Sequence, residues 1–224
     1  FFVDLKPFKK SFELGGKTVT LETGRIARQA TGSVLVTVDD ISVLGTVVGA
    51  KEAKPGQPFF PLTVNYFEKT YAVGKIPGGF FKREGRPSEG AILISRVIDR
   101  TLRPLFPKNM RNDVQIILMS LAHDKEHHVD MLGIIAASTA LMISDIPWAG
   151  PVAGARVGLI DGELKVNPTY TEMTKSTLDL RVSGTADAIN MVECNASEVD
   201  EDTMLEALFL AHDSIQDIIA LQNQ

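Results

Sequence analysis

The chain has 224 residues, 44% hydrophobic and 23% charged, which is the composition of a globular protein long enough to bury a sizeable core. A single cysteine, Cys194, excludes an intramolecular disulfide framework, and no apolar run approaches the length of about 18 residues that a membrane span needs. The net charge of −5 gives no overall attraction to nucleic acid. Because the first residues lack the apolar stretch of a secretory signal, we expect a cytoplasmic protein with no membrane partner.

The N-terminal part is predicted to form an antiparallel meander of β-strands. Three segments rich in β-branched residues, 17–22, 33–39 and 42–50, are separated by glycine or by the turn Asp39-Asp40. The next stretch, 53–79, has prolines and glycines around one apolar core and predicts a loop, a strand and a second loop. That loop ends at Gly78-Gly79, where the backbone can take a positive φ.

The remainder of the chain alternates helices with strands. A helix is expected from about Ser88 to Arg103, since Pro104 cannot continue it, and another from Met131 to Ile143. A closing helix is expected from about Glu198 to Leu221. The expected strands are 114–122, 152–160, 163–167, 177–184 and 188–194. Hairpins mixed with crossovers predict an α+β fold with a mixed sheet, and the lack of a linker or repeat predicts one domain over residues 1–224.

Basic residues are concentrated in one segment. Between Lys82 and Arg111 eight lysines and arginines stand against three acids, a net of +5 that leaves −10 for the rest of the chain. Such a contrast is a focused field that attracts an anionic ligand to one place. We therefore expect a polyanionic partner that binds locally.

The expected helix carries three of these cations on one side. At 100° per residue, Arg96, Arg100 and Arg103 fall within roughly 60° of one another. The opposite side is formed by Ile94, Val97, Ile98, Thr101 and Leu105. An exposed arginine stripe suits a phosphate backbone, because guanidinium groups present paired donors and stay charged. The alternative is a solvated face on which Asp99 pairs with Arg103.

Directly before this helix, the segment GGFFKREGRPSEG joins two aromatic rings to a cluster of cations. Aromatic rings stack on bases and neighbouring cations hold phosphates, which is how single strands are bound without sequence preference. In the alternative interpretation, one or both rings pack into the domain's own core or at a subunit contact. We favour a nucleic-acid-contacting loop formed by Phe80, Phe81, Lys82, Arg83 and Arg86.

The segments PGGFFKREGRPSEG and RVIDRTLRPLFP closely resemble the first ribonuclease-PH-like domain of the bacterial polynucleotide phosphorylase (polyribonucleotide nucleotidyltransferase) family. The resemblance extends through TVTLETGRIARQATGSV, AKPGQPFFPLTVNY, GPVAGARVG, LDLRVSGT and MVEC, so it covers essentially the whole chain as the first portion of a longer protein. It implies a ribonuclease-PH-like (ribosomal protein S5 domain 2-like) fold. It also implies a phosphate-dependent 3′-to-5′ exoribonuclease that releases nucleoside diphosphates from single-stranded RNA in mRNA degradation.

The same resemblance implies partners and roles for the basic residues. It implies a homotrimer around a central channel, a second ribonuclease-PH-like domain in each subunit, and an RNA-degradation complex as a further partner. The loop from Phe80 to Arg83 would narrow the channel and grip single-stranded RNA. Arg96, Arg100 and Arg103 would guide the RNA toward the catalytic centre.

Catalytic groups are expected outside this chain. Phosphorolysis needs a cradle for phosphate and carboxylates that hold a divalent metal, and the resemblance places both in the second domain. The corresponding stretch here, HHVDMLGIIAAS, has no Gly-Ser cluster. Thr171 and Thr177 stand near the expected positions of the paired aspartates, Glu172 is the nearest carboxylate, and Asp179 is interpreted as structural or superficial. We expect no catalytic residue or metal ligand in this chain, with Mg²⁺ or Mn²⁺ and inorganic phosphate serving the full enzyme.

Other constellations leave alternatives open. His123 and His127 have a spacing that could ligate zinc on a helix, but the tract follows a strand, so we interpret it together with His128 as a solvated polar connection. Two further functions compete with RNA guidance. One is an autonomous ribonuclease-PH-like phosphorolytic enzyme, and the other is a purely structural oligomerisation domain.

Overall fold

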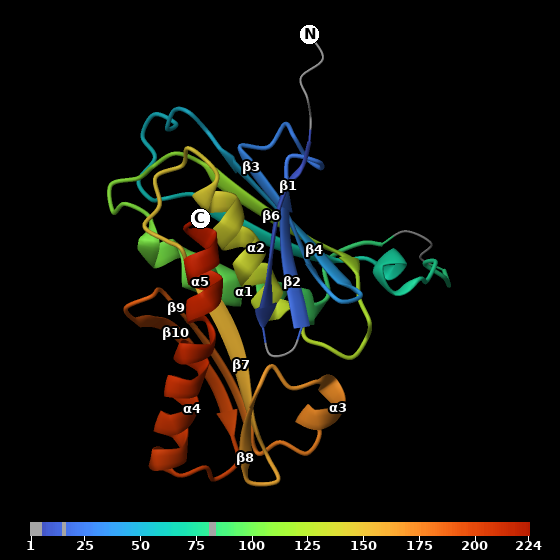
Figure 1. Cartoon of the computed structure of the whole chain (residues 1–224). Coiled ribbons are helices and arrows are strands. Elements are labelled where there is room, and N and C mark those ends of the chain that lie inside the picture. The colour runs from blue at the N-terminus through green and yellow to red at the C-terminus, as the bar shows by residue number, and fades with distance from the viewer. Residues whose placement is uncertain (1–5, 15–16, 81–83) are drawn as a thin grey trace.

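The computed structural model describes residues 6–14, 17–80 and 84–224 and contains two β-sheets with helices packed between and outside them (Figure 1). The first sheet contains β1 (Phe8–Leu14), β2 (Lys17–Thr23), β3 (Gly32–Val38), β4 (Ile41–Gly49), β5 (Leu62–Glu68) and β6 (Val114–Ala122). The second contains β7 (Ala153–Ile160), β8 (Glu163–Val166), β9 (Leu178–Gly184) and β10 (Ile189–Ala196). The helices are η1 (Thr70–Val73), α1 (Glu89–Leu102), η2 (Arg103–Leu105), α2 (Asp130–Met142), α3 (Tyr170–Met173), α4 (Glu201–Ser214) and α5 (Gln216–Gln222).

The six-stranded sheet is mixed, with the order β1-β2-β3-β4-β6-β5. Its neighbours are antiparallel except β5 and β6, which are parallel. Parallel strands cannot be joined by a tight hairpin, and here the connection contains α1. On β3 and β4 alternate residues such as Val34, Val36, Val43 and Val47 are buried, which is the period-two pattern of strands with one face on the core.

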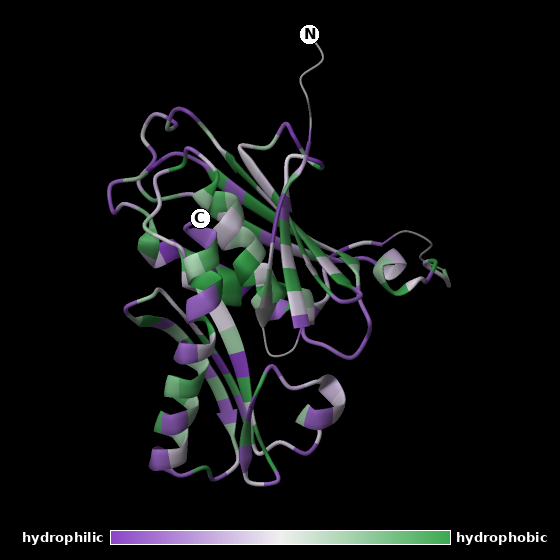
Figure 2. Ribbon diagram, viewed as in Figure 1, coloured by the Kyte–Doolittle hydropathy of each residue, from purple (hydrophilic) through white to green (hydrophobic). Residues whose placement is uncertain are grey.

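Helix α2 lies between the two sheets and is buried along almost its whole length, and green, hydrophobic residues make up much of it in Figure 2. Glycines allow its close approach. A Cβ added at Gly45 would lie 2.9 Å from the carbonyl oxygen of Ala136, and one at Gly154 of β7 would lie 2.8 Å from Met131 Sδ. Such short distances leave no room for a side chain, so α2 is a shared core element of both sheets.

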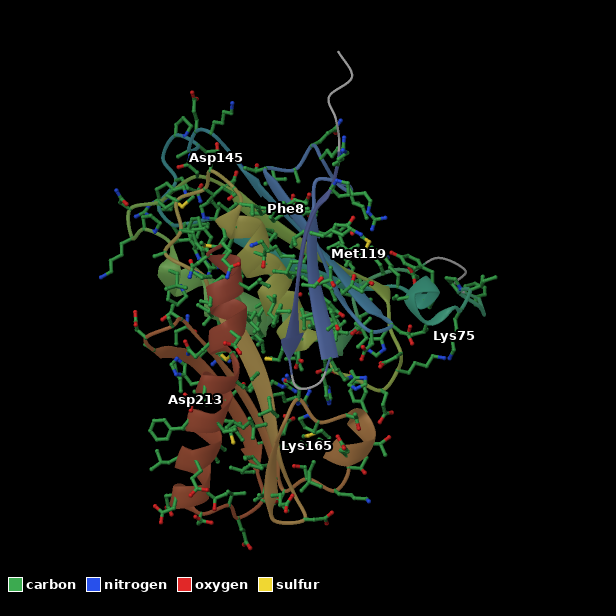
Figure 3. All side chains as sticks on the ribbon, viewed as in Figure 1. Phe8, Lys75, Met119, Asp145, Lys165 and Asp213 are labelled. Carbon is green, nitrogen blue, oxygen red and sulfur yellow. The ribbon has the colours of Figure 1, made fainter. Side chains whose placement is uncertain are left out.

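The two faces of the four-stranded sheet differ in chemistry. Leu178, Leu180 and Val182 of β9 are buried in the hydrophobic core, and the intervening positions are polar or charged. Helix α4 packs against β7, β8 and β9 and begins at Asp200, whose carboxylate accepts a hydrogen bond from the N–H of Thr203 at 2.9 Å. Asp213 near the end of α4 points away from the sheet (Figure 3).

The expected architecture is confirmed as α+β, with one mixed sheet, although a second, antiparallel sheet accompanies it. The meander, the helix after Ser88 and the strands of the second half occur within a few residues of their predicted bounds. Strand β1 was not expected. The closing helix is interrupted at Ile215, whose N–H bonds to the carbonyl of His212 three residues back, so that α4 and α5 are separate helices.

In the described part of the chain, no helix has both the length and the apolar character needed to cross a membrane.

Candidate nucleic-acid interface

Helix α1 forms where the sequence predicts it because its ends carry clear signals. The hydroxyl of Ser88 accepts a hydrogen bond from the N–H of Ala91 at 3.1 Å, and Glu89 lies in the first turn, where a negative charge favours the helix N-terminus. The helix ends at Leu102, and Pro104 follows in η2. Val97, Ile98 and Thr101 are buried, whereas Arg96, Arg100 and Arg103 are exposed, so the predicted division into two faces is confirmed.

Arg103 is the most restrained of the three exposed arginines. Its Nε and Nη2 donate to the carboxylate of Asp99 at 2.7 and 2.5 Å, so the pairing considered from sequence is present. Nη2 also donates to the carbonyl of Leu62 at 3.2 Å, and the guanidinium lies 6.0 Å from the ring centroid of Phe60. Hydrogen bonding to Asp99 raises the pKa of Arg103. This side chain is committed to the protein on several sides.

Arg100 and Arg96 are progressively less restrained. Nη1 of Arg100 donates to Glu193 Oε2 at 3.2 Å, and the Arg100 side chain remains 54% exposed. Arg96 is exposed, and its side chain makes no hydrogen bond or ion pair with the residues that the structure describes. One turn of helix therefore separates a cation available to an external anion from one that shares its charge with an internal carboxylate.

The loop before α1 is only partly described. Phe80 has 94% of its surface exposed and follows Gly79, whose φ of +77° lies in the left-handed region that favours glycine. Arg86 is exposed as well, whereas the predicted contacts Phe81, Lys82 and Arg83 lie outside the described residues. In this chain, then, Phe80 does not pack into the core, and the interpretation that both rings are buried in it is wrong for Phe80.

The loop is fastened at its base to the segment around η1. The carboxylate of Glu84 accepts hydrogen bonds from the N–H of Thr70 at 2.6 Å and from its hydroxyl at 2.8 Å, and it lies 3.1 Å from Lys69 Nζ. These hydrogen bonds lower the pKa of Glu84 and keep it charged. The segment carrying Lys75 projects from the body of the molecule (Figure 3). Ile76 is 91% exposed there, an apolar position that sequence reasoning missed because nothing separates it from an ordinary loop residue.

A second charged cluster, which sequence reasoning also missed, lies on the polar face of the four-stranded sheet. Arg156 of β7 donates to both carboxylate oxygens of Asp179 at 2.7 and 2.6 Å and lies 3.5 Å from Asp130 Oδ2. Arg181 of β9 lies 3.4 Å from the same Asp130 oxygen and donates to Glu193 Oε1 at 2.9 Å. Charged residues alternate with leucine and valine at the start of strand β9, and this pattern was the signal in the sequence that could have indicated the cluster. We name Asp130, Arg156, Asp179, Arg181 and Glu193 the inner ion cluster.

The histidine tract is not the solvated connection that we expected. His127 Nδ1 contacts Asp124, and His127 Nε2 lies 2.6 Å from Lys17 Nζ. His128 is half-buried, accepts a hydrogen bond at Nδ1 from Arg156 at 2.5 Å, and lies 3.9 Å from Tyr170 between ring centroids. Burial, and then the charge of Arg156, lower the pKa of His128 to about 4. The tract looks solvated in the sequence because Lys17, Arg156 and Tyr170, which contact its histidines, are remote from it along the chain.

The carboxylates available here do not fit a divalent metal. In the described residues no group of three or more histidine, cysteine, aspartate or glutamate side chains is arranged to hold one. Asp130 and Asp179 are paired with arginines, which compete with any cation, and this pairing agrees with the interpretation of Asp179 as structural. Glu172 caps α3 in a reciprocal pair with Thr169 and contacts Lys165. Thr171 belongs to the same short helix.

Comparison with sequence families matches the chain in two adjacent parts. Residues 15–147 match domain 1 of the 3′ exoribonuclease family, and residues 150–214 match domain 2. The chain is 58% identical over 212 residues to a polyribonucleotide nucleotidyltransferase from Gluconobacter oxydans (strain 621H), covering 95% of this chain and 30% of that protein. It is also 58% identical over 211 residues to the same-named protein from Brucella suis (strain ATCC 23445 / NCTC 10510), covering 94% and 30%. The chain therefore spans about 30% of the length of these curated relatives.

Comparison with solved structures matches the fold. A chain of the Archaeoglobus fulgidus exosome with RNA bound to the active site superposes with a TM-score of 0.67 and 18% sequence identity, covering 95% of this chain and 86% of that chain. At this identity the likeness concerns the fold alone. It confirms the fold class expected from the sequence.

Proposed function

The chain belongs to the 3′ exoribonuclease family, and we propose that it forms the RNA-guiding, ring-forming first core of a phosphate-dependent 3′-to-5′ exoribonuclease. The full-length protein would release nucleoside diphosphates from single-stranded RNA. The names of its 58%-identical relatives support the nucleotidyltransfer, and the single hydrophobic core shared by both sheets supports one structural unit over residues 1–224.

One observation carries the RNA-guiding role: on an otherwise acidic chain, the loop with the exposed ring of Phe80 leads in sequence into α1, which carries an exposed arginine stripe. Phe80 supplies a flat surface on which a base can stack, and Arg86 and Arg96 supply charges for the phosphates on either side. We propose that Phe81, Lys82 and Arg83 extend this surface, and that Arg100 and Arg103 continue it along the helix. None of these contacts depends on base identity.

The chemistry would take place elsewhere in the full-length protein. We propose that inorganic phosphate is the co-substrate and that Mg²⁺ or Mn²⁺ is held by carboxylates outside this chain, where it would stabilise charge on the reacting phosphoryl group. The inner ion cluster supports this division, because each of its carboxylates is already opposed by an arginine. In this chain the arginines bind and orient the RNA and take no part in proton transfer.

The proposed partners follow from the same reasoning. They are single-stranded RNA, a second ribonuclease-PH-like domain of the same subunit, two further copies that complete a homotrimer, and an RNA-degradation complex in the cytoplasm. A subunit contact would also cover Ile76, which is 91% exposed.

The RNA contacts can be tested in the full-length protein by combining Arg83→Glu with Arg100→Glu. Affinity for a single-stranded oligoribonucleotide, measured without phosphate so that no phosphorolysis occurs, should fall at least about ten-fold for every sequence tried. A matched control, Lys51→Glu with Lys175→Glu, makes the same total charge change at two exposed sites away from α1. Equal affinities of the double variant and the wild type would contradict the contact assignment.

The division between binding and chemistry has its own test. Residues 1–224 alone should release no nucleoside diphosphate from RNA in the presence of phosphate and Mg²⁺, whereas the full-length protein should. Phosphate-dependent release by the short chain would instead favour the autonomous enzyme.

A further inference from the structure

Arg100 differs from its neighbours on α1 in being held by an acid from a different element. Glu193 lies on β10, paired in register with Arg181 on β9. Its carboxylate is shared: Oε1 accepts from Arg181 Nη1 at 2.9 Å, and Oε2 accepts from Arg100 Nη1 at 3.2 Å. One carboxylate thus connects the exposed face of α1 to the four-stranded sheet.

The sheet end of this connection is fixed. Nε of Arg181 lies 3.4 Å from Asp130 Oδ2, and its Nη2 lies 3.5 Å from Asp179 Oδ2. Asp130 is 3% exposed, and both aspartates are also paired with Arg156. Arg181 thus lies between two carboxylates of the sheet at ion-pair distance and donates its hydrogen bond to Glu193, whose second oxygen meets Arg100.

The ion pair between Arg100 and Glu193 is expected to contribute little to the stability of the fold. The side chains of Arg100 and Glu193 are 54% and 40% exposed, and an exposed ion pair typically contributes little to folding. Glu193 engages Nη1 of Arg100, and the Nε and Nη2 donors of that guanidinium meet no acceptor among the described residues. A long arginine side chain loses rotamer freedom when it binds, and a contact that restrains it beforehand reduces that loss.

We propose that Glu193 is a positioning residue for RNA binding: braced by Arg181, it holds the guanidinium of Arg100 in the orientation that meets the RNA backbone. The inference rests on the proposed RNA contact of Arg100. It assigns a favourable role to an acid whose charge by itself would repel RNA.

Positioning and charge repulsion predict opposite changes in RNA affinity when the charge of Glu193 is removed. In the full-length protein, Glu193→Gln keeps the size of the side chain but removes the charge that holds both arginines. Positioning predicts that affinity for a single-stranded oligoribonucleotide, measured without phosphate, falls roughly two- to ten-fold. Simple repulsion predicts tighter binding, which would overturn the proposal. The matched control is Asp187→Asn, which removes the same charge from an exposed residue in the turn between β9 and β10 and should not weaken binding.

A double-mutant cycle with Arg100→Gln separates positioning from a general effect on the fold. Glu193→Gln should have no further effect once Arg100 is replaced, because its influence acts through that side chain. The slope of log affinity against log salt concentration should fall by about one for Arg100→Gln but stay unchanged for Glu193→Gln. An equal loss from Glu193→Gln in both backgrounds would overturn the proposal.

The two levels of inference fail in distinguishable ways. If Arg100→Gln leaves RNA affinity and salt slope unchanged, the proposed RNA contact itself is overturned, and the role of Glu193 with it. If Arg100→Gln weakens binding but Glu193→Gln does not, the RNA contact stands and the positioning role is overturned.

Discussion

Arginines occur in two contrasting settings in this chain: the outer face of α1 and the inner ion cluster. In the inner ion cluster, Arg156 and Arg181 each lie within 3.5 Å of two or more carboxylates, and Arg156 is 7% exposed. On α1, Arg103, Arg100 and Arg96 have successively fewer partners and are all exposed. The charges of the inner ion cluster pair with one another, whereas the outer face of α1 keeps an excess of positive charge. A count of basic residues therefore indicates a ligand only when their counter-ions are located too.

The largest expected effect comes from breaking the inner ion cluster. Arg156→Ala removes the nearest arginine from Asp179 and one of two arginines from Asp130, and removing one member of a buried ion pair costs about 3–5 kcal/mol. Protection of the β7 and β9 amides from hydrogen exchange in the full-length protein should fall accordingly. The same truncation on α1, Arg96→Ala, should change protection by less than about 0.5 kcal/mol. Equal losses of protection in Arg156→Ala and Arg96→Ala would show that the inner ion cluster contributes no more to stability than the outer face of α1.

An intermediate effect should appear with pH, because only the inner ion cluster packs against a histidine. Burial, and then Arg156, lower the pKa of His128 to about 4 from an ordinary 6.5. The unfolded chain takes up this proton near pH 6.5 and the folded chain only near 4, so stability is present above pH 6.5 and is lost as pH falls toward 4. His128→Gln should flatten this part of a pH profile of denaturation midpoints between pH 7 and 4.5. Parallel profiles for the two proteins would show that His128 does not carry it.

The smallest effect is expected for Asp99→Asn on α1. Asp99 and Arg103 form an exposed i, i+4 pair, and such pairs stabilise a helix by about 0.3–0.5 kcal/mol. Arg103 also keeps its hydrogen bond to the carbonyl of Leu62. Hydrogen exchange of the α1 amides should therefore change very little. A loss of stability above about 1 kcal/mol would show that Arg103 behaves like a member of a buried ion pair and that the outer face of α1 contributes to folding.

Local signals explain what the sequence could predict. The bounds of α1 follow from the Ser88 cap and Pro104, and the strands of the meander follow from their β-branched residues and the turns that separate them. Strand β1 was missed because FKKSFEL has no β-branched residue, and it gains its pairing from β2. Element type is set within a few residues of chain, so a single sequence is sufficient to infer it.

The charged residues of the site also divide into those that local sequence places together and those that only the tertiary fold places together. The arginine stripe on α1 could be predicted because helical periodicity alone brings its members together. The pairing of Arg100 with Glu193 joins residues 93 positions apart, and that of Arg156 with Asp179 joins residues 23 apart on different strands. No periodicity encodes such contacts. His128 looked solvated for this reason, since Arg156 and Tyr170 reach it only through the tertiary fold.

The burial of α2 between the two sheets has a consequence for how this chain can be divided or recombined. The helix belongs to the part that matches domain 1 of its family, residues 15–147, yet Met131 and Ile134 press on Gly154 in the part that matches domain 2. A break near Trp148 would expose the face of α2 that packs on β7 and would leave that strand without one of the helices that pack on it. The two parts thus share one packed core, and a chimaera that exchanges one of them must also match the small residues where the other meets it.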